Sequence, residues 1–313
     1  MPLNSNKMKT QKQIVVFLAG IFLSFTLQAQ EFIPLWPKGK MPNTKGMLLK
    51  DSIANERVYK VGTPGMYAFF PSQQENKGAA VVICPGGGYE RLAYVISGIQ
   101  LAKWFNTMGI SAFVLNYRLP NSPDLINREM GPLQDAQRAI KVIRSNAPKW
   151  GIKTDKIGIQ GSSAGGHLAS LAGVTTKDVS YIGDTLDKYS AKANFMILVS
   201  PVVDMGNYAH KGSKKNLLGL NPSNEQINQY STHLQVTDQT SPAFIVSAFN
   251  DNTVDSHNSL LLYQALLEHK VSSTLHIFPQ GGHAIALRNN PGSTELWTEL
   301  CERWMIEAGI ISR

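Results

Sequence analysis

The segment GIQGSSAGGHLAS, residues 158–170, combines a short apolar run, two adjacent serines and several glycines. Ser163 is the central residue of a G-x-S-x-G pattern whose ends are Gly161 and Gly165. In this pattern a strand turns so tightly into a helix that the serine hydroxyl is exposed, and residues larger than glycine collide with neighbouring backbone. Ser162 occupies a variable position and does not satisfy the spacing. A flexible Gly/Ser loop is the competing interpretation, and the flanking sequence distinguishes the two.

Strand-like and helix-like segments alternate on both sides of Ser163. Strand-like runs, most of them continuously apolar as in a strand buried on both faces, occur at 79–84, 110–117, 156–160, 195–199, 244–248 and 273–278. Helical patterns occur at 98–108, 133–146, 164–173, 256–269 and 294–308. This alternation predicts an α/β fold with a mostly parallel central sheet and helices on both faces. Ser163 then lies between a strand and a helix, as its pattern requires.

The first residues have the features of an export signal. A basic region contains Lys7, Lys9 and Lys12, and the apolar run Ile14–Leu27 ends near the small residue Ala29. This run is shorter than the roughly 20 residues of a membrane-spanning helix. We therefore predict a signal peptide over 1–29 and a periplasmic or secreted protein without stable membrane insertion after cleavage, with an uncleaved anchor as the alternative.

Residues 30–313 are predicted to form a single domain. Its first part, residues 30–75, contains several prolines and short apolar pieces, and we expect a lead-in with one or two strands. The segment 204–240 breaks the alternation with polar residues punctuated by glycine and proline. Because it is long for a plain connection, it predicts a small inserted cap or a substrate-binding loop.

Composition argues against several functions. The 313 residues carry a formal net charge of +8, but three of the lysines lie in the predicted signal and the others are scattered. Without a basic stripe interleaved with aromatic residues, nucleic acid is not an expected partner. Cys84 and Cys301 are predicted to be buried free thiols, and no Cys/His spacing resembles a metal site. No metal and no cofactor are expected.

Three consecutive glycines, Gly86 to Gly88, follow the predicted strand 79–84. Such a run lets backbone amides converge on one point, as an oxyanion hole requires, although a flexible turn is the competing interpretation. A phosphate-binding loop would end in Gly-Lys-Ser or Gly-Lys-Thr, which is absent here. The carboxyl end of a strand is where parallel sheets place their binding groups, and this position favours the oxyanion role.

An acid and a histidine follow the last two predicted strands. His283 stands behind two glycines after the final strand, where it can take the proton of Ser163 as general base. Asp251 and Asp255 both follow the preceding strand, and Asp251, nearer the strand end, is preferred as the residue that orients the histidine. The chain order Ser163, Asp251, His283 is that of α/β-hydrolases.

Five stretches together resemble a known family. The chain is similar to secreted bacterial α/β-hydrolases of the esterase/lipase superfamily, in the carbohydrate-esterase-like branch grouped with acetyl xylan and feruloyl esterases. The stretches are CPGGGY (84–89), GSSAGGHLAS (161–170), HKGSKKNLLGLNPS (210–223), NDNTVDSHNSLLLYQALLEHKV (250–271) and LHIFPQGGHAIAL (275–287). The similarity runs from about residue 75 to the C-terminus.

The resemblance implies a serine ester hydrolase that needs no cofactor. Position by position, it assigns the nucleophile, acid and base to Ser163, Asp251 and His283, and the oxyanion-hole amides to Gly87, Gly88 and Ala164. Two positions depart from the family pattern. Asp255 stands where relatives commonly have proline, which supplies a second carboxylate, and Pro85 stands where lipase-like relatives have histidine. The second departure favours the sugar-esterase branch over the lipase branch.

The predicted substrate is an acetylated or feruloylated plant polysaccharide or oligosaccharide, such as acetylated xylan. Tyr89, Arg91 and His210 are candidate substrate-binding residues. Two other functions remain open. A serine peptidase of the prolyl-oligopeptidase type shares the chain order but carries a large N-terminal propeller, which residues 30–75 are too short to form. A non-catalytic carbohydrate-binding protein on the same fold usually lacks a triad member. The sequence carries no signal for the oligomeric state.

Overall fold

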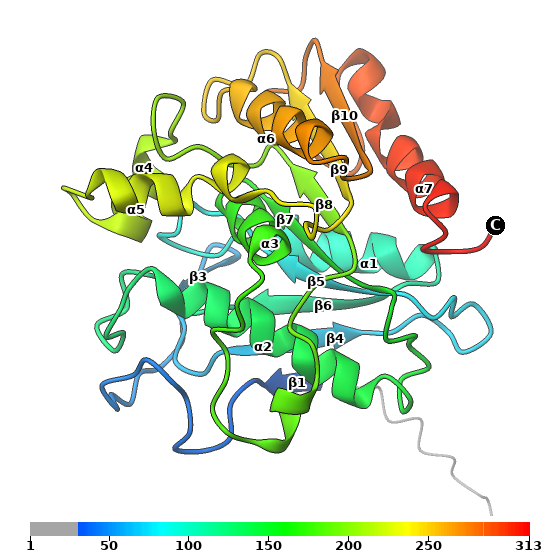
Figure 1. Ribbon diagram of the computed structural model, residues 1–313. Coiled ribbons are helices and arrows are strands. Elements are labelled where there is room, and N and C mark those ends of the chain that lie inside the picture. Colours follow the sequence, from blue (N-terminus) through cyan, green and yellow to red (C-terminus); the bar gives the residue numbers. More distant parts are fainter. Residues whose placement is uncertain (1–30, 284) are drawn as a thin grey trace, which may run out of the picture.

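The computed structural model describes residues 31–283 and 285–313, so the signal peptide predicted for residues 1–29 lies outside the described residues. An eight-stranded sheet has the order β1-β4-β6-β5-β7-β8-β9-β10 (Figure 1). Its strands are β1 (Glu31–Pro34), β4 (Gly65–Phe69), β5 (Ala80–Cys84), β6 (Ser111–Asn116), β7 (Ile157–Ser162), β8 (Met196–Val199), β9 (Ala243–Ala248) and β10 (Ser273–Phe278). The strands from β6 through β10 in this order are mutually parallel, and β4 and β1 extend the sheet antiparallel. The predicted mostly parallel α/β sheet is confirmed.

Helices cover both faces of this sheet, which explains why its inner strands are apolar on both sides. The helices are α1 (Gln100–Thr107), α2 (Met130–Asn146), α3 (Ala164–Val174), α6 (His257–Glu268) and α7 (Trp297–Glu307). Along β5, Val82 and Cys84 join the core shared with α2, α3 and α6. The alternate residues Val81 and Ile83 join the core shared with α1 and α7 on the other face. A π-helical turn, Val95–Ile99, precedes α1, and a 3-10 turn, Gly292–Leu296, precedes α7.

Helix α2 is buried along most of its length, on its polar side as well as its apolar side. The segment around the 3-10 turn Thr185–Lys188 covers its polar side and supplies carboxylates to its cations. The Arg138 guanidinium donates to Asp184 over 3.0 Å, and the Lys141 ammonium donates to Asp187 over 2.7 Å. Buried charges need such partners because an unpaired one is costly. The polar side of α2 is therefore a second packing face.

The N-terminal part contains more strands than the one or two expected. β1 and β4 join the main sheet, while β2 (Ser52–Ala54) and β3 (Arg57–Lys60) form a separate two-stranded sheet. Every residue of β2 is exposed, so this strand has no apolar alternation from which it could be predicted.

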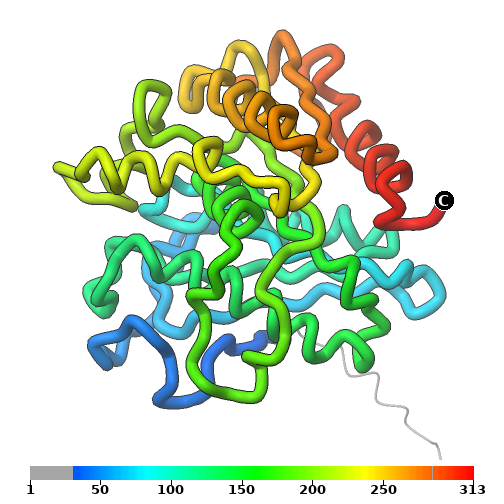
Figure 2. Tube along the Cα trace, in the orientation of Figure 1, coloured from blue at the N-terminus to red at the C-terminus, as the bar shows by residue number. Residues whose placement is uncertain are grey.

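The segment 204–240 is mostly helical, with α4 (Lys211–Leu218), α5 (Asn224–Tyr230) and a 3-10 turn, Thr232–Gln235. His210 caps α4, and Ser223 caps α5 through a reciprocal capping box. The 3-10 turn packs against α3 and α6, and the yellow-green trace in Figure 2 leaves the sheet, forms α4 and α5, and returns beside α6.

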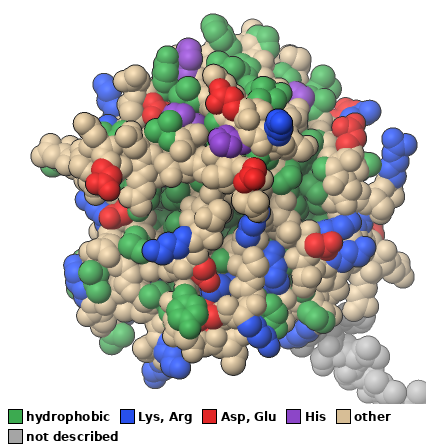
Figure 3. Space-filling view, viewed as in Figure 1, with side chains coloured by type: hydrophobic (Ala, Val, Ile, Leu, Met, Phe, Trp, Pro, Cys, Tyr) green, Lys and Arg blue, Asp and Glu red, His purple; other side chains and the backbone are tan. Residues whose placement is uncertain are grey.

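Cys84 and Cys301 are both free and buried, as predicted from the sequence. Burial raises the pKa of both thiols. Lys and Arg side chains are spread over the face shown in Figure 3, with Asp and Glu between them. No helix within residues 31–283 and 285–313 has the length and hydropathy of a membrane span.

Candidate active site

Ser163 lies at the turn between β7 and α3, in a backbone conformation that is uncommon for a residue with a side chain. Its φ is 57° and its ψ is −123°. The Ser163 amide donates to the carbonyl of Val199 over 3.0 Å, and the Ser163 carbonyl accepts from the amide of Val202 over 3.1 Å. Such conformations cost about 1–3 kcal/mol and persist where the surroundings hold them. The neighbouring strand β8 and the chain after it therefore fix the turn.

The glycines around Ser163 are required by close backbone contacts. A Cβ atom placed on Gly161 would lie 2.0 Å from the carbonyl oxygen of Gly165. One placed on Gly165 would lie 2.0 Å from the carbonyl oxygen of Cys84, and one on Gly86 would lie 2.7 Å from that of Ser162. Any larger residue would push these backbone segments apart, which contradicts the interpretation of a flexible Gly/Ser loop.

His283 links Ser163 to Asp251. Its Nε2 lies 2.9 Å from Ser163 Oγ, and its Nδ1 lies 2.8 Å from Asp251 Oδ2. Because a carboxylate only accepts hydrogen bonds, Nδ1 carries the proton and Nε2 presents its lone pair to the serine hydroxyl. The loop that carries His283 is held by a hydrogen bond of 2.8 Å from the Gly282 amide to the side chain of Asn250. The structure therefore brings the three residues predicted from the sequence into one hydrogen-bonded chain.

The environment of Asp251 distinguishes it from Asp255. The Asp251 side chain has no exposed surface, and its Oδ1 accepts from the amides of Thr253 and Val254 over 2.8 and 2.9 Å. Burial acts to raise the pKa of Asp251, but the hydrogen bonds from His283 and from these amides hold the pKa below its usual value. The Asp255 side chain is 53% exposed and bonds His257 instead. Asp251 is the carboxylate that contacts His283.

Three backbone amides beside Ser163 are free to bind an oxygen atom. Gly87 and Gly88 have φ values of 133° and 65°, and Ala164 is the first residue of α3. Among residues 31–283 and 285–313, none accepts a hydrogen bond from these three amides. The N-terminus of α3 adds a partial positive charge at the same place. The arrangement can bind a negatively charged oxygen near Ser163.

Asn216, which the sequence reasoning did not single out, holds the glycine loop. Its side-chain amide donates to the backbone carbonyl of Gly88 over 2.8 Å, while the backbone carbonyl of Asn216 accepts from the Arg128 guanidinium over 2.7 Å. Asn216 belongs to α4, so the segment 204–240 is connected directly to the backbone that carries the free amides. The one signal for Asn216 in the sequence is that it lies in HKGSKKNLLGLNPS (210–223), one of the stretches that resemble the family.

Ser163 and His283 open into a cavity of 530 Å³. Arg91 and His210, two of the three predicted substrate-binding residues, line it, and so does Asn216. Tyr89 does not line the cavity, and the prediction for this residue is wrong. Its φ of 58° turns the side chain inward, where it is fully buried and its hydroxyl lies 2.8 Å from Nδ1 of His167.

His210 presents a neutral ring to the cavity. Its Nδ1 accepts from the amide of Ser213 over 3.2 Å, so the proton resides on Nε2. Burial, and secondarily the charge of His283, lowers the pKa of His210, which favours the neutral form. The ring lies close to Gly88, since a Cβ atom on Gly88 would lie 3.9 Å from Cε1 of His210. His210 can therefore donate one hydrogen bond from Nε2 near the free amides.

The doubly covered parallel sheet, the tight turn at Ser163 and its contact with His283 define an α/β hydrolase. The BD-FAE family model matches residues 66–266, and the chain belongs to this family. The family resemblance seen in the sequence is confirmed. The chain is 34% identical to a solved structure of an acetyl ester-xyloside bifunctional hydrolase from Caldicellulosiruptor lactoaceticus, with a TM-score of 0.77, covering 92% of this chain and all of that one.

Two curated proteins are similar to parts of the chain. It is 35% identical over 227 residues to an acetylxylan esterase of Xylanibacter ruminicola, covering 71% of this chain and 44% of that protein. It is 34% identical over 255 residues to endo-1,4-beta-xylanase B of Butyrivibrio fibrisolvens, covering 80% of this chain and 40% of that protein. The chain thus spans less than half the length of these relatives. Together the comparisons show that the chain is similar to acetylxylan esterases and related ester hydrolases.

Proposed function

We propose that the protein is a serine carboxylic-ester hydrolase that removes acetyl groups from xylan or from its oligosaccharides. The observation that carries the proposal is the hydrogen-bonded chain from Asp251 through His283 to Ser163, beside backbone amides that donate to none of the residues the structure describes. An acid, a base and a nucleophile in this order at a strained turn are the groups that acyl transfer needs.

In the first step, Ser163 Oγ attacks the ester carbonyl carbon while His283 Nε2 takes the hydroxyl proton. The carbonyl oxygen becomes negatively charged and is bound by the amides of Gly87, Gly88 and Ala164. His283 then returns the proton to the leaving alcohol, and an acetyl group remains on Ser163. Asp251 stabilises the positive charge that forms on the imidazole ring.

In the second step, water replaces the alcohol. His283 Nε2 removes a proton from the water molecule, whose oxygen attacks the acetyl-serine carbonyl. The same amides bind the charged oxygen, and collapse of the intermediate releases acetic acid and restores the Ser163 hydroxyl. Every proton transferred in the cycle passes through His283, so its contact with both partners is essential to the mechanism.

Three observations support a sugar ester as the substrate. One curated relative is an acetylxylan esterase, and a relative that aligns over its full length is an acetyl ester-xyloside hydrolase. The cavity also presents donors suited to sugar oxygens, from Arg91 and from Nε2 of His210. We assign His210 and Arg91 to contacts with the alcohol part of the ester and propose that segment 204–240 acts as a short cap. Export through the predicted signal peptide would bring such an enzyme to its polymer.

Release of acetate from acetylated xylo-oligosaccharides tests the proposal. We expect the wild-type protein and Ser162→Ala to release acetate, and Ser163→Ala to release none above background. Ser162→Ala is the matched control because it removes the adjacent hydroxyl from the same turn. Feruloylated oligosaccharides, assayed in parallel, determine the acyl group, and faster release of ferulate than of acetate would overturn the acetyl assignment.

The alternative functions give different results. A peptidase of the prolyl-oligopeptidase type would cleave a proline-containing peptide substrate faster than any ester. A carbohydrate-binding protein without catalytic activity would bind xylo-oligosaccharides yet hydrolyse none of the esters. Either result would contradict the proposed function.

A further inference from the structure

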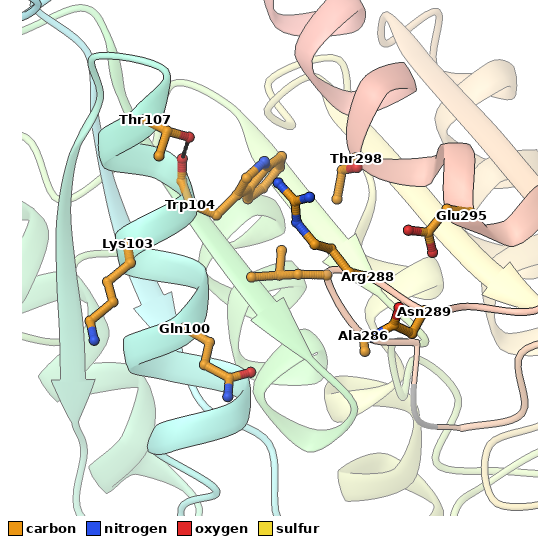
Figure 4. Close-up of a pocket in the computed structure, with 10 residues that line it drawn as sticks. Gln100, Lys103, Trp104, Thr107, Ala286, Arg288, Asn289, Glu295 and Thr298 are labelled. Carbon is orange, nitrogen blue, oxygen red and sulfur yellow. Dashed lines mark hydrogen bonds between the residues drawn. The ribbon is translucent and has the colours of Figure 1, made fainter.

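A second cavity of 670 Å³ lies between α1 and the chain that leads into α7. Figure 4 shows Trp104 on α1 facing Arg288 and Thr298 across this space. Its volume lies within the roughly 300–1,000 Å³ that is typical of small-molecule sites. We call it the α1–α7 groove.

The groove adjoins the catalytic cavity. Ala286 and Leu287 line both spaces, so these two residues form their common wall. Hydrogen bonds fix this wall, because the Ala286 carbonyl accepts from the Trp297 indole over 2.6 Å and from the Asn290 side chain over 2.8 Å. The Ala286 amide donates back to Asn290 over 2.9 Å. The groove and the catalytic cavity therefore lie next to each other, on either side of this wall.

The lining of the groove suits a carbohydrate. Trp104 is partly exposed, and its ring packs 5.4 Å from that of the buried Trp297, which holds it in place. An aromatic face of this kind packs against the apolar faces of sugar rings. Within the described part of the chain, the side chains of Gln100, Arg288 and Asn289 hydrogen-bond to no other residue, so their polar groups are available to hydroxyl groups.

We propose that the α1–α7 groove binds sugar units of the alcohol part of the substrate, next to the sugar that carries the ester. This inference rests on the proposed function, because it assumes a sugar ester in the catalytic cavity. It predicts that longer oligosaccharide esters are better substrates than short ones. The groove would then contribute binding energy that a small ester such as p-nitrophenyl acetate does not use.

Kinetics on substrates of different length test the proposal. We compare p-nitrophenyl acetate, a monoacetylated methyl xyloside and monoacetylated xylotetraose, using the wild type, Trp104→Ala and Arg288→Ala. We expect the wild type to show a higher kcat/KM on the tetraose than on the xyloside. Trp104→Ala should reduce kcat/KM on the tetraose about tenfold more than on p-nitrophenyl acetate. Tyr181→Ala, an exposed aromatic position on the segment that covers α2, is the matched control.

Direct binding separates this inference from the proposed function. Titration calorimetry with unacetylated xylotetraose on Ser163→Ala protein requires no catalysis, and Trp104→Ala in that background should weaken binding about tenfold. Trp104→Ala also removes the packing of Trp104 on Trp297, so a second variant is needed. Arg288→Ala serves this purpose because Arg288 is exposed. The groove assignment is overturned if neither substitution changes binding, or if the loss in kcat/KM is equal on all three esters. If the protein hydrolyses p-nitrophenyl acetate but kcat/KM does not depend on the length of the oligosaccharide ester, the groove assignment is wrong and the proposed ester hydrolase function stands.

Discussion

Substitution of Asp251 by asparagine tests whether Asp251 is the acid that orients His283. Two backbone amides that donate to Asp251 determine how an asparagine would be oriented there. The amides of Thr253 and Val254 both donate to one carboxylate oxygen of Asp251. In Asp251→Asn, the side-chain oxygen must take that position, because the amide nitrogen offers only donors to these two donors. The new NH₂ group then faces Nδ1 of His283.

This arrangement forces the wrong tautomer of His283. Facing a donor, Nδ1 must be unprotonated, so the proton moves to Nε2 and the ring can no longer accept the proton of Ser163. An equivalent change in another serine hydrolase triad lowers kcat about 10⁴-fold, which corresponds to about 5.5 kcal/mol of activation free energy. We expect a loss of that order here, because the two amides leave the asparagine one favourable orientation.

The assay is hydrolysis of p-nitrophenyl acetate, with thermal unfolding as the check that each variant is folded. Asp255→Asn is the matched control, since Asp255 is 53% exposed and lies in the same loop. We expect it to keep activity within about twofold of the wild type, as surface substitutions usually do. Equal activity of the two variants, or a larger loss for Asp255→Asn, would refute the reasoning.

Three further predictions follow from particular contacts. Asn216→Ala frees the carbonyl of Gly88 and should lower kcat about tenfold with little change in KM in steady-state kinetics, which is less than the roughly 100- to 1,000-fold loss on removal of an oxyanion-hole donor, because the amides themselves remain. Burial lowers the pKa of His167 to about 4, so below pH 6.5 the unfolded chain binds a proton more readily than the folded protein does. The free energy of unfolding should therefore be highest above pH 6.5 and fall by roughly 3 kcal/mol as the pH falls to 4. Denaturant titrations should show this slope flattened in His167→Gln, and an unchanged slope would contradict the assignment. Gly165→Ala places a Cβ atom 2.0 Å from a carbonyl oxygen and should destabilise the protein by about 1–3 kcal/mol or abolish activity, measured by thermal unfolding and ester hydrolysis.

The parallel strands were predictable because a strand that is buried on both faces is apolar along nearly its whole length. β5 and β9 are buried at every position; β5 is a continuous apolar run, and in β9 only Ser247 interrupts one. β2 is exposed throughout, and β1 is partly exposed, so neither has a pattern to detect. The burial of the charged side of α2 leaves no local pattern in the sequence, because its partner carboxylates lie 46 residues away.

The site was predictable where the chemistry fixes both the residue type and its place after a strand. Ser163 and His283 meet both conditions, and the structure places them in contact. Tyr89 failed because its positive φ, uncommon for a residue other than glycine, directs the ring into the core. Asn216 was missed because its contact with Gly88 spans 128 residues and belongs to no local pattern.

Covalent labelling tests the central claim, that Ser163 is the nucleophile of an ester hydrolase. A fluorophosphonate reacts with an activated serine hydroxyl, and mass spectrometry of the intact protein and of its peptides counts and locates the adducts. We expect one adduct per chain, on Ser163, formed equally in Ser162→Ala and absent in Ser163→Ala. An adduct on Ser162, or an unlabelled wild-type protein, would contradict the account.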